Sequence, residues 1–490
     1  MSDRKEEVVV PQYSRNLRYL SNRILGFHRN RFVLNTMSAV SAGPNRQIRF
    51  SMPENSVIDL ASLKFQMTVK TNGQTSGGGS PINLVAMSGY ANDFLYRVQV
   101  FMNGVQISSG MSEWNSCWRL KQAAVCNNDH DESVDTACCN VRLPNVAPTY
   151  AATDAQEINM AVMNWFGILG AESSVRYLDT SLCGRLEVVL TSSPVEGCLT
   201  PCLAGAHTTT RWKNPGAAYD EATLKTILNN VIVDDLPALD PSPSDLTYNM
   251  SDFWETCDSI SIDDGLYDYL LRKRIQEVGW LNVNCKEYYS FLNDQSSATA
   301  YQARYSVSSQ SIDKIFASQR LSTYANYPKQ ATPSHTLPST ELYPLQGHFI
   351  NGVPNWYAFK SFDTPTNGAR YQASINNVKH PTARQNKFEV MEASAYANEC
   401  VPVKENGNQI CSVPQFDDCS FVDTTRLNLG CDGDDALSVY QISGFDSRGV
   451  NTIMTWEPSG MKDDAKSSLV LVETSMSIRV GQGKQIATIF

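Results

Sequence analysis

The sequence predicts an all-β protein made of two large antiparallel β-domains, and three observations indicate this class. From Tyr96 to Met102 every second residue is apolar and polar residues stand between most of them, which is typical of a strand with one buried face. Asn103-Gly104 follows at once, and these two residues readily adopt the positive φ angles of a type I′ hairpin turn. The alternation starts again after residue 280, and 490 residues suit two β-domains of about 200–250 residues each.

The composition favours a folded chain that buries surface against copies of itself. Apolar residues make up 42% of the chain and aromatic residues 10%, which is enough for real cores. Charged residues make up only 18%, against roughly 25% in ordinary soluble domains, and charge is depleted where protein surfaces meet. The formal net charge of −10 argues against a protein that coats nucleic acid over its whole surface.

Residues 1–34 are predicted to form a basic amphipathic arm ahead of the first domain. Apolar residues recur at helical spacing from Leu17 to Phe27. Residues 12–31 contain no acidic residue and five arginines, namely Arg15, Arg18, Arg23, Arg29 and Arg31. Two interpretations are open: a helix packed on its own domain, or an arm that contacts an inner-face partner, which would be an inner membrane or packaged nucleic acid.

The first β-domain is predicted over residues 35–240. Alternating apolar residues predict strands at residues 48–52, 63–69, 186–190 and 227–233. The glycine-rich stretch 71–80 lacks the Gly-Lys-Ser/Thr of a phosphate-binding loop and is expected to be exposed. Residues 127–133, NNDHDES, favour a solvated loop over a metal site.

A proline-marked connector is predicted over residues 241–277. No lysine or arginine occurs from Thr226 to Leu271, whereas ten acidic residues do. This acidic stretch indicates a solvated face or a docking surface for basic neighbours. A helix is expected near Asp264 to Glu277.

The second β-domain is predicted over residues 241–490, with the connector as its first part. Period-two patterns predict strands at residues 281–284, 303–307 and 476–480. Two short helices are expected in the connections, one at residues 311–319 and one within residues 381–397.

Cysteine usage predicts a reducing compartment. The thirteen cysteines are scattered and form no C-x-x-C pair, and the opening MSDRKEEVVVP lacks the apolar core of a signal peptide. Buried or semi-buried free thiols are therefore expected. No apolar run reaches about 18 residues, so no membrane span is predicted.

The order of these pieces resembles that of the double jelly-roll major capsid proteins, the lineage that includes adenovirus hexon, virophages and polinton or adintovirus elements. In the first half the resemblance lies in IRFSMPENSVIDLASLKFQMTV (48–69), LYRVQVFMNGVQI (95–107), GRLEVVLTSSPVEG (184–197) and ILNNVIVDDLPALD (227–240). In the second half it lies in YQASINNVKHP (371–381), NKFEVMEASAYAN (386–398), SVYQISGFDSRGV (438–450) and the final strands from 468 to 490. Residues 110–175 and 320–365 are unmatched insertions.

The resemblance implies two consecutive eight-stranded antiparallel jelly rolls, with short helices in the connections and the basic arm at the N-terminus. It further implies a homotrimer whose six rolls form a pseudo-hexagonal capsomer in the icosahedral shell of a DNA virus. Expected partners are neighbouring trimers, penton proteins, minor or cement capsid proteins, and an inner membrane or packaged DNA through the arm. The expected location is the virion capsid, with synthesis in the reducing host cytoplasm or nucleus and no secretion.

No catalytic, cofactor-binding or metal-binding constellation is recognisable. The six histidines are scattered without an H-E-x-x-H motif, and FDSRG (445–449) has Phe445 where a nucleophile elbow needs glycine. CDGDD (431–435) resembles the start of a calcium loop without its downstream glutamate. We therefore predict no enzyme activity, no cofactor and no metal.

Two classes of function remain open at this stage. The first is a major capsid protein. The second is a carbohydrate- or receptor-binding β-sandwich of the spike or lectin kind, or a minor capsid protein. The binding module predicts aromatic residues exposed on loops, such as Trp356 and Tyr357.

Overall fold

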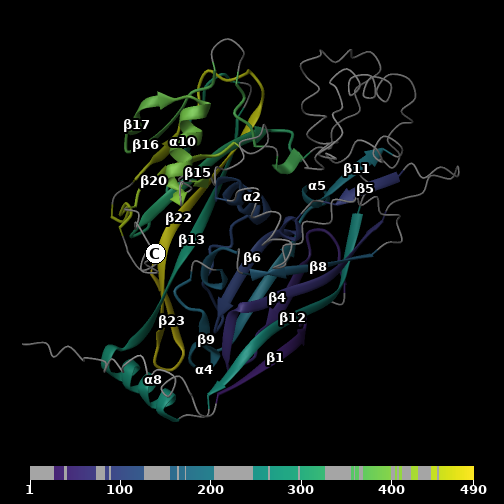
Figure 1. Ribbon diagram of the computed structural model, residues 1–490, viewed down its shortest axis with the longest axis vertical. Coiled ribbons are helices and arrows are strands. Elements are labelled where there is room, and N and C mark those ends of the chain that lie inside the picture. The colour runs from purple at the N-terminus through teal and green to yellow at the C-terminus, as the bar shows by residue number, and fades with distance from the viewer. Residues whose placement is uncertain are drawn as a thin grey trace, which may run out of the picture.

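Two β-sandwiches lie side by side in the computed structural model of the chain (Figure 1). The structure describes residues 27–37, 41–72, 83–87, 90–125, 155–162, 165–170, 173–203, 247–262, 265–295, 298–325, 355–357, 359–363, 368–398, 403–405, 408–410, 421–428, 443–449 and 452–489.

The first sandwich consists of two antiparallel sheets, each with four main strands, and two short strands extend one of them. Their strand orders are β1-β12-β4-β8 and β3-β10-β6-β7. The bounds are β1 (Phe27–Asn35), β3 (Gln47–Ser51), β4 (Val57–Asn72), β6 (Leu95–Met102), β7 (Val105–Gln106), β8 (Ala155–Ala161), β10 (Leu186–Ser192) and β12 (Thr247–Ile262).

The second sandwich repeats the arrangement of the first. Its sheets are ordered β13-β22-β15-β20 and β14-β21-β16-β17. The bounds are β13 (Trp280–Gln295), β14 (Ala303–Tyr305), β15 (Ile312–Leu321), β16 (Tyr371–Ile375), β17 (Val378–Gln385), β20 (Asp423–Arg426), β21 (Met454–Trp456) and β22 (Lys466–Gly481).

Numbered in chain order, the eight strands of each sandwich pair as 1-8-3-6 in one sheet and 2-7-4-5 in the other. This is the two-Greek-key arrangement of a jelly roll. The prediction of two consecutive eight-stranded jelly rolls is therefore confirmed. The remaining strands are β2 (Ser41–Ala42), β5 (Asn83–Met87), β9 (Tyr177–Asp179), β11 (Leu199–Leu203), β18 (Val403–Glu405), β19 (Asn408–Ile410) and β23 (Gln485–Ile489).

The roll boundaries differ from those expected. Strand β1 starts at Phe27, inside the expected arm, and pairs with β12 along its whole length. Strand β12 lies in the expected connector 241–277 but pairs with β4 in the first roll. The first roll thus begins at residue 27 and ends at residue 262, because its first and last strands are neighbours in one sheet.

Helices occupy the connections between strands. The bounds are α2 (Trp114–Val125), α4 (Thr180–Cys183), α5 (Val195–Cys198), α8 (Gly265–Val278) and α10 (Lys387–Ala397), with 3-10 turns η2 (Ala91–Phe94), η4 (Gly167–Leu169) and η6 (Asn355–Tyr357). The helices expected near 264–277 and within 381–397 are confirmed as α8 and α10. The helix expected at 311–319 is wrong, because that segment is strand β15, paired on both sides with β22 and β20.

Turn chemistry agrees with the sequence at the first-roll hairpin. Asn103 and Gly104 have φ angles of 49° and 81°, as a type I′ turn requires. The equivalent β16–β17 hairpin of the second roll uses Asn376 and Asn377, with φ angles of 48° and 70°. Asparagine tolerates this left-handed conformation better than most side chains do.

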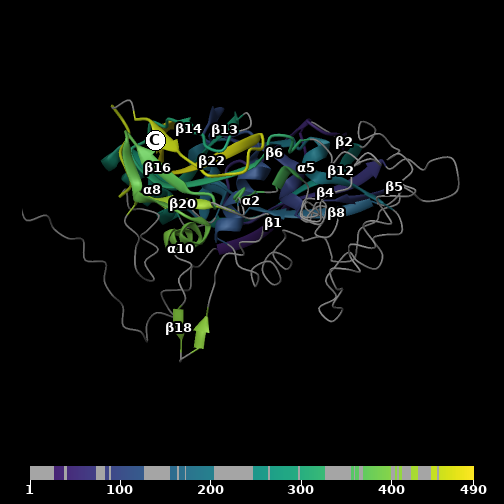
Figure 2. The same cartoon turned by 90° about the horizontal axis from the view of Figure 1, so that it is seen from above.

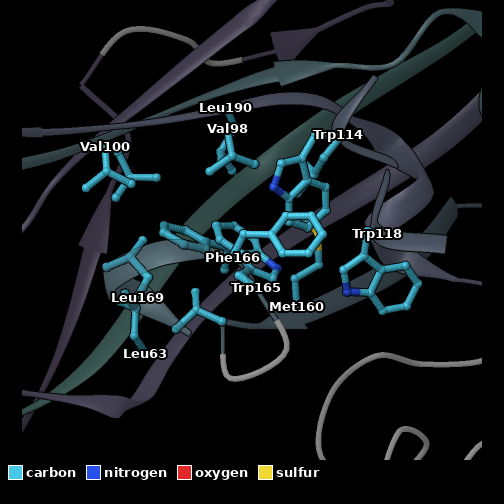
Figure 3. Close-up of a cluster of buried hydrophobic side chains, with 14 of the residues drawn as sticks. Leu63, Val98, Val100, Trp114, Trp118, Met160, Trp165, Phe166, Leu169 and Leu190 are labelled. Atoms are coloured by element: carbon cyan, nitrogen blue, oxygen red, sulfur yellow. The ribbon is translucent and has the colours of Figure 1, made fainter. Parts of the chain in front are cut away.

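The core of the first roll is rich in aromatic side chains. Phe65 of β4 stacks on Trp165 with ring centroids 5.4 Å apart, and Trp114 meets Trp165 edge-on at 5.4 Å. Figure 3 shows this cluster, with Val98 and Leu190 beside Trp114 and above Trp165, and with Leu63 and Leu169 to one side. Helix α2 therefore belongs to this core through Trp114 and Trp118, although sequence comparison placed it in an unmatched insertion.

Several expectations lie outside the described residues. These are the loop at 127–133, the strand at 227–233, the acidic run at 431–435 and residues 438–442 of the late strand pattern.

One buried carboxyl group in the first roll has no polar partner. Glu255 of β12 is fully buried, and neither of its carboxylate oxygens has a hydrogen-bond partner. Its cross-strand neighbours are Leu34 and Phe65. Burial raises the pKa of Glu255 to about 7, because the apolar surroundings disfavour the charged form.

We predict that Glu255→Gln relieves a pH-dependent loss of stability. The folded-state pKa of about 7 lies above the ordinary value of 4.5, so the carboxyl group favours folding below pH 4.5 and opposes it increasingly as pH rises to 7. Wild-type stability should fall by up to about 3 kcal/mol over that interval relative to the Gln variant. Urea unfolding across this range tests the difference. The exposed Glu277→Gln variant is the control, and a pH-independent difference between wild type and Glu255→Gln would contradict the assignment.

Candidate functional site

The candidate site is not a catalytic pocket but the surface along which the two rolls meet, here called the inter-roll junction. It comprises the first-roll segment 109–121 with Asp93, and the second-roll residues that face it from β13, β15, β22 and η6. Its chemistry determines whether the two rolls act as one rigid body.

The sheet β13-β22-β15 is buried on both of its faces. On β22, Val470 and Val472 pack inside the second roll, whereas the alternate residues Leu469 and Leu471 belong to the core cluster of the first roll. On β15, Phe316 likewise belongs to the core cluster of the first roll, whereas its neighbours Ile315 and Ala317 belong to that of the second roll. A sheet covered on both faces gives nearly continuous burial, as β22 shows from residue 466 to 476.

A buried ion pair crosses the junction. The Arg320 guanidinium of β15 donates to the Glu113 carboxylate just ahead of α2, and both residues are almost completely buried. Arg320 Nη1 also donates to the Trp356 carbonyl at 2.6 Å and to Ser116 Oγ at 3.0 Å. Tyr324 donates to Glu113 Oε1 at 2.8 Å, and its ring lies 3.4 Å from the guanidinium carbon. Both charged groups thus have several hydrogen-bond partners, as a buried pair requires, and of the guanidinium nitrogens only Arg320 Nε has none.

A second polar network lies beside the first. Asn115 Nδ2 donates to Tyr357 Oη at 3.0 Å, and Tyr357 donates to the Gly197 carbonyl at 2.7 Å. Arg119 forms a bidentate pair with Asp93, with contacts of 2.9 and 2.6 Å. Burial and the nearby Asp93 charge raise the pKa of Tyr357, so its hydroxyl remains a donor.

Hydrogen bonds also join the long strand β13 to the first roll, at a second place along the junction. The Glu287 carboxylate accepts from the Ser109 amide at 2.9 Å, and Ser109 Oγ donates to the Tyr288 carbonyl at 2.6 Å. Burial raises the pKa of Glu287. Lys121 Nζ donates to Tyr288 Oη at 2.8 Å, so α2 also reaches this strand.

Arg29 and Arg31 lie in strand β1 rather than in a helical arm. Arg29 Nη2 contacts Asp59 at 3.0 Å and Asp258 at 2.7 Å, and Arg31 Nε contacts Asp258 at 2.9 Å. Hydrogen bonding from Arg31 is the main cause that holds the pKa of Asp258 below its ordinary value. These pairs fix β1 on the sheet. Asp258, from the expected acidic connector, thus neutralises charge on Arg29 and Arg31, from the expected basic arm. Arg15, Arg18 and Arg23 lie outside the described residues.

The residues proposed for glycan binding are not exposed. Trp356 is 5% exposed and Tyr357 is 3% exposed, and both belong to the junction. The expectation that they stand on an open loop is wrong. Nothing in the sequence showed their burial, because their partners Asn115 and Arg320 are far away along the chain.

The described cysteines are buried and free, as predicted. They are Cys117, Cys183, Cys198, Cys257 and Cys285. Burial raises the pKa of Cys183 and of Cys257 to about 12, so these thiols stay protonated and unreactive at neutral pH. Among the described residues, no group of three or more His, Cys, Asp or Glu side chains is placed to hold a metal ion. No described helix is both long and apolar enough to cross a membrane.

No protein-family model and no curated protein matches the sequence. Solved structures match it over almost its whole length. The quasi-atomic model of the PBCV-1 virus capsid has a TM-score of 0.53 at 10% identity, covering 95% of this chain and 97% of that chain. PBCV-1 VP54, fitted into a reconstruction of the virophage Sputnik, gives 0.53 at 11% identity with the same coverage.

The Faustovirus major capsid protein gives a TM-score of 0.53 at 9% identity, covering 93% of this chain and 91% of that chain. At such identities the likeness concerns the fold alone. The chain has the double jelly-roll fold of these viral major capsid proteins, which confirms the fold implied by the sequence resemblance.

We predict that removing one partner of the buried pair destabilises the junction strongly. Arg320→Met leaves the Glu113 carboxylate buried without its cation and should cost about 3–5 kcal/mol of unfolding free energy. Glu113→Gln should cost a similar amount, and the double variant less than the sum. Urea unfolding of the four proteins measures the coupling, with the exposed Arg304→Met as control. Additive losses would show that the two groups act independently.

Proposed function

We propose that this chain is a major capsid protein, and that three copies form a pseudo-hexagonal capsomer that tiles an icosahedral shell. The observation that carries the proposal is the repetition of one strand order in two rolls fused across a buried junction. A chain with two nearly equivalent blocks gives six blocks in a threefold ring, which approximates a hexagon. Similarity to the PBCV-1 capsid and Faustovirus structures supports the same assignment.

The exposed surface supports assembly with further protein copies. Large apolar side chains remain open on several elements, including Phe388 at 75% and Tyr396 at 57% on α10, and Trp254 at 43% on β12. Scattered exposed apolar residues are ordinary, but α10 presents two aromatic rings on one helical face. An obligate trimer interface of more than about 2,000 Å² would cover such residues. The virion capsid as location, and penton, minor or cement proteins as partners, follow from the proposal.

The same observations argue for a structural role without enzyme activity. The buried polar cluster around Arg320 and Glu113 serves the inter-roll junction, and the cluster of Arg29, Arg31 and Asp258 holds strand β1 on its sheet. The alternative, a glycan- or receptor-binding sandwich, loses the support of the two aromatic residues named for it, because Trp356 and Tyr357 are buried.

We predict that the purified protein is a trimer in solution. Light scattering coupled to size-exclusion chromatography should give about 163 kDa, three times the chain mass of 54.3 kDa. A stable monomer at every accessible concentration would contradict the proposal.

We also predict that the segment ahead of β1 acts after trimer formation. Deleting residues 1–26 should leave the trimer mass unchanged and impair shell closure or attachment of an inner partner, because β1 remains paired with β12. Deleting residues 1–35 should destabilise the first roll, because it removes β1 and opens the β12 edge. Electron microscopy of assembled particles shows whether the shells are closed. Loss of the trimer in the shorter deletion would assign the segment to the subunit interface instead.

A further inference from the structure

Four polar side chains meet where the strands β13, β22 and β15 run side by side (Figure 1). Lys286 of β13 pairs in register with Ser475 of β22. The Ser475 amide donates to the carbonyl of Ser311, just ahead of β15, and Asp313 is the second residue of β15. Three neighbouring strands therefore bring a lysine, an aspartate and two serines to one place.

Hydrogen bonds connect all four side chains. Lys286 Nζ lies 2.5 Å from Asp313 Oδ2 and donates to Ser475 Oγ at 2.9 Å. Ser475 Oγ donates in turn to the same Asp313 Oδ2 at 2.6 Å. Ser311 Oγ donates to the other carboxylate oxygen, Asp313 Oδ1, at 2.7 Å. The amine nitrogen, the Ser475 hydroxyl and Asp313 Oδ2 thus form a closed triangle of hydrogen bonds.

The cluster is closed to solvent. Asp313 and Ser311 are fully buried, and Lys286 and Ser475 are at most 7% exposed. The backbone at Gly444 lies directly over the carboxylate, because its amide donates to Ser311 Oγ at 2.9 Å. A Cβ atom at this glycine would lie 2.5 Å from Asp313 Oδ1, so a larger residue could not cover the site in the same way.

A buried lysine–aspartate pair can do chemistry that the Arg320–Glu113 pair cannot. A guanidinium group stays protonated in proteins, whereas a buried ε-amino group can lose a proton and become a nucleophile. Transfer of one proton from Lys286 Nζ to Asp313 Oδ2 along their hydrogen bond gives a neutral amine beside a neutral carboxylic acid. A buried site of low dielectric constant favours these neutral forms, because an isolated charge is costly there.

We propose that Lys286 and Asp313 condense to an isopeptide bond within the chain. The Nζ lone pair attacks the carboxyl carbon, the bond from this carbon to Oδ2 breaks, and Oδ2 leaves as water. The ammonium group supplies both protons of that water, one directly and one through the Ser475 hydroxyl, and its third proton remains as the amide N–H.

The geometry supports each part of this step. Because Oδ2 is bonded to the carboxyl carbon, Lys286 Nζ already lies about 3.5 Å from the atom it attacks. Ser475 contacts both the donor and the acceptor of the relayed proton. Ser311 donates to Oδ1, where negative charge develops during the attack. No oxidant or further reactant is needed, and the bond would join β13 to β15 across β22 whether or not the chain forms trimers.

The intact mass of the full-length protein, held at neutral pH, tests the proposal. The wild type should be lighter than its sequence mass by one water molecule. Lys286→Arg keeps the ion pair but has no nucleophilic amine, so its mass should equal its sequence mass. Ser475→Ala should condense more slowly, because the proton relay is lost. Ser477→Ala is the matched control on the same strand, since its hydroxyl contacts Asn284 instead, and it should condense like the wild type.

Peptide mapping locates the bond. Trypsin does not cleave after an acylated lysine, so residues 275–304 should appear as one peptide joined through Lys286 and Asp313 to residues 305–314. A wild-type mass equal to the sequence mass would overturn the proposal. A loss of water that persists in Lys286→Arg would do the same, because the dehydration would then lie elsewhere. Equal rates in Ser475→Ala and Ser477→Ala would overturn the relay. Light scattering of the same samples shows separately whether the capsomer proposal stands.

Discussion

The structure depends on one constraint, the burial of the β13-β22-β15 sheet on both of its faces. One face packs in the core of the second roll, and the other face packs against the core of the first roll. Alternate residues of β22 therefore serve two different cores, as Val470 and Leu471 do. Neither roll could turn relative to the other without exposing this apolar surface to water, so the chain behaves as one block.

The polar groups of the junction add specificity to this burial. An apolar interface tolerates sliding, whereas Arg320 must meet Glu113 and the Trp356 carbonyl at the same time. A misaligned junction would leave a buried charge without a partner, which costs several kcal/mol. The view from above in Figure 2 shows the two rolls extended along one layer, with α10 projecting from the second roll. A fixed double block of this kind suits a repeating shell.

The sequence predicted the double β-architecture because strands with one buried face alternate visibly, as β4 and β6 do. It missed β1 because both faces of that edge strand are polar or exposed, and Arg29 and Arg31 resemble an arm until Asp258 is seen beside them. It misplaced β12 because a bulge between Ser251 and Trp254 shifts the period. Glu255 also interrupts the apolar pattern, because this charged residue type lies on the buried face of β12 between Phe253 and Cys257. The junction could not be predicted, since Glu113 and Arg320 are 207 residues apart.

The central claim is that this chain is a rigid two-roll block built to assemble in threes, and single-particle electron microscopy of the purified protein tests it most directly. The account predicts particles with threefold symmetry, a six-sided outline and six jelly rolls whose pairwise orientation does not vary. Particles that contain two rolls only, or in which the angle between paired rolls varies from one particle to another, would contradict it.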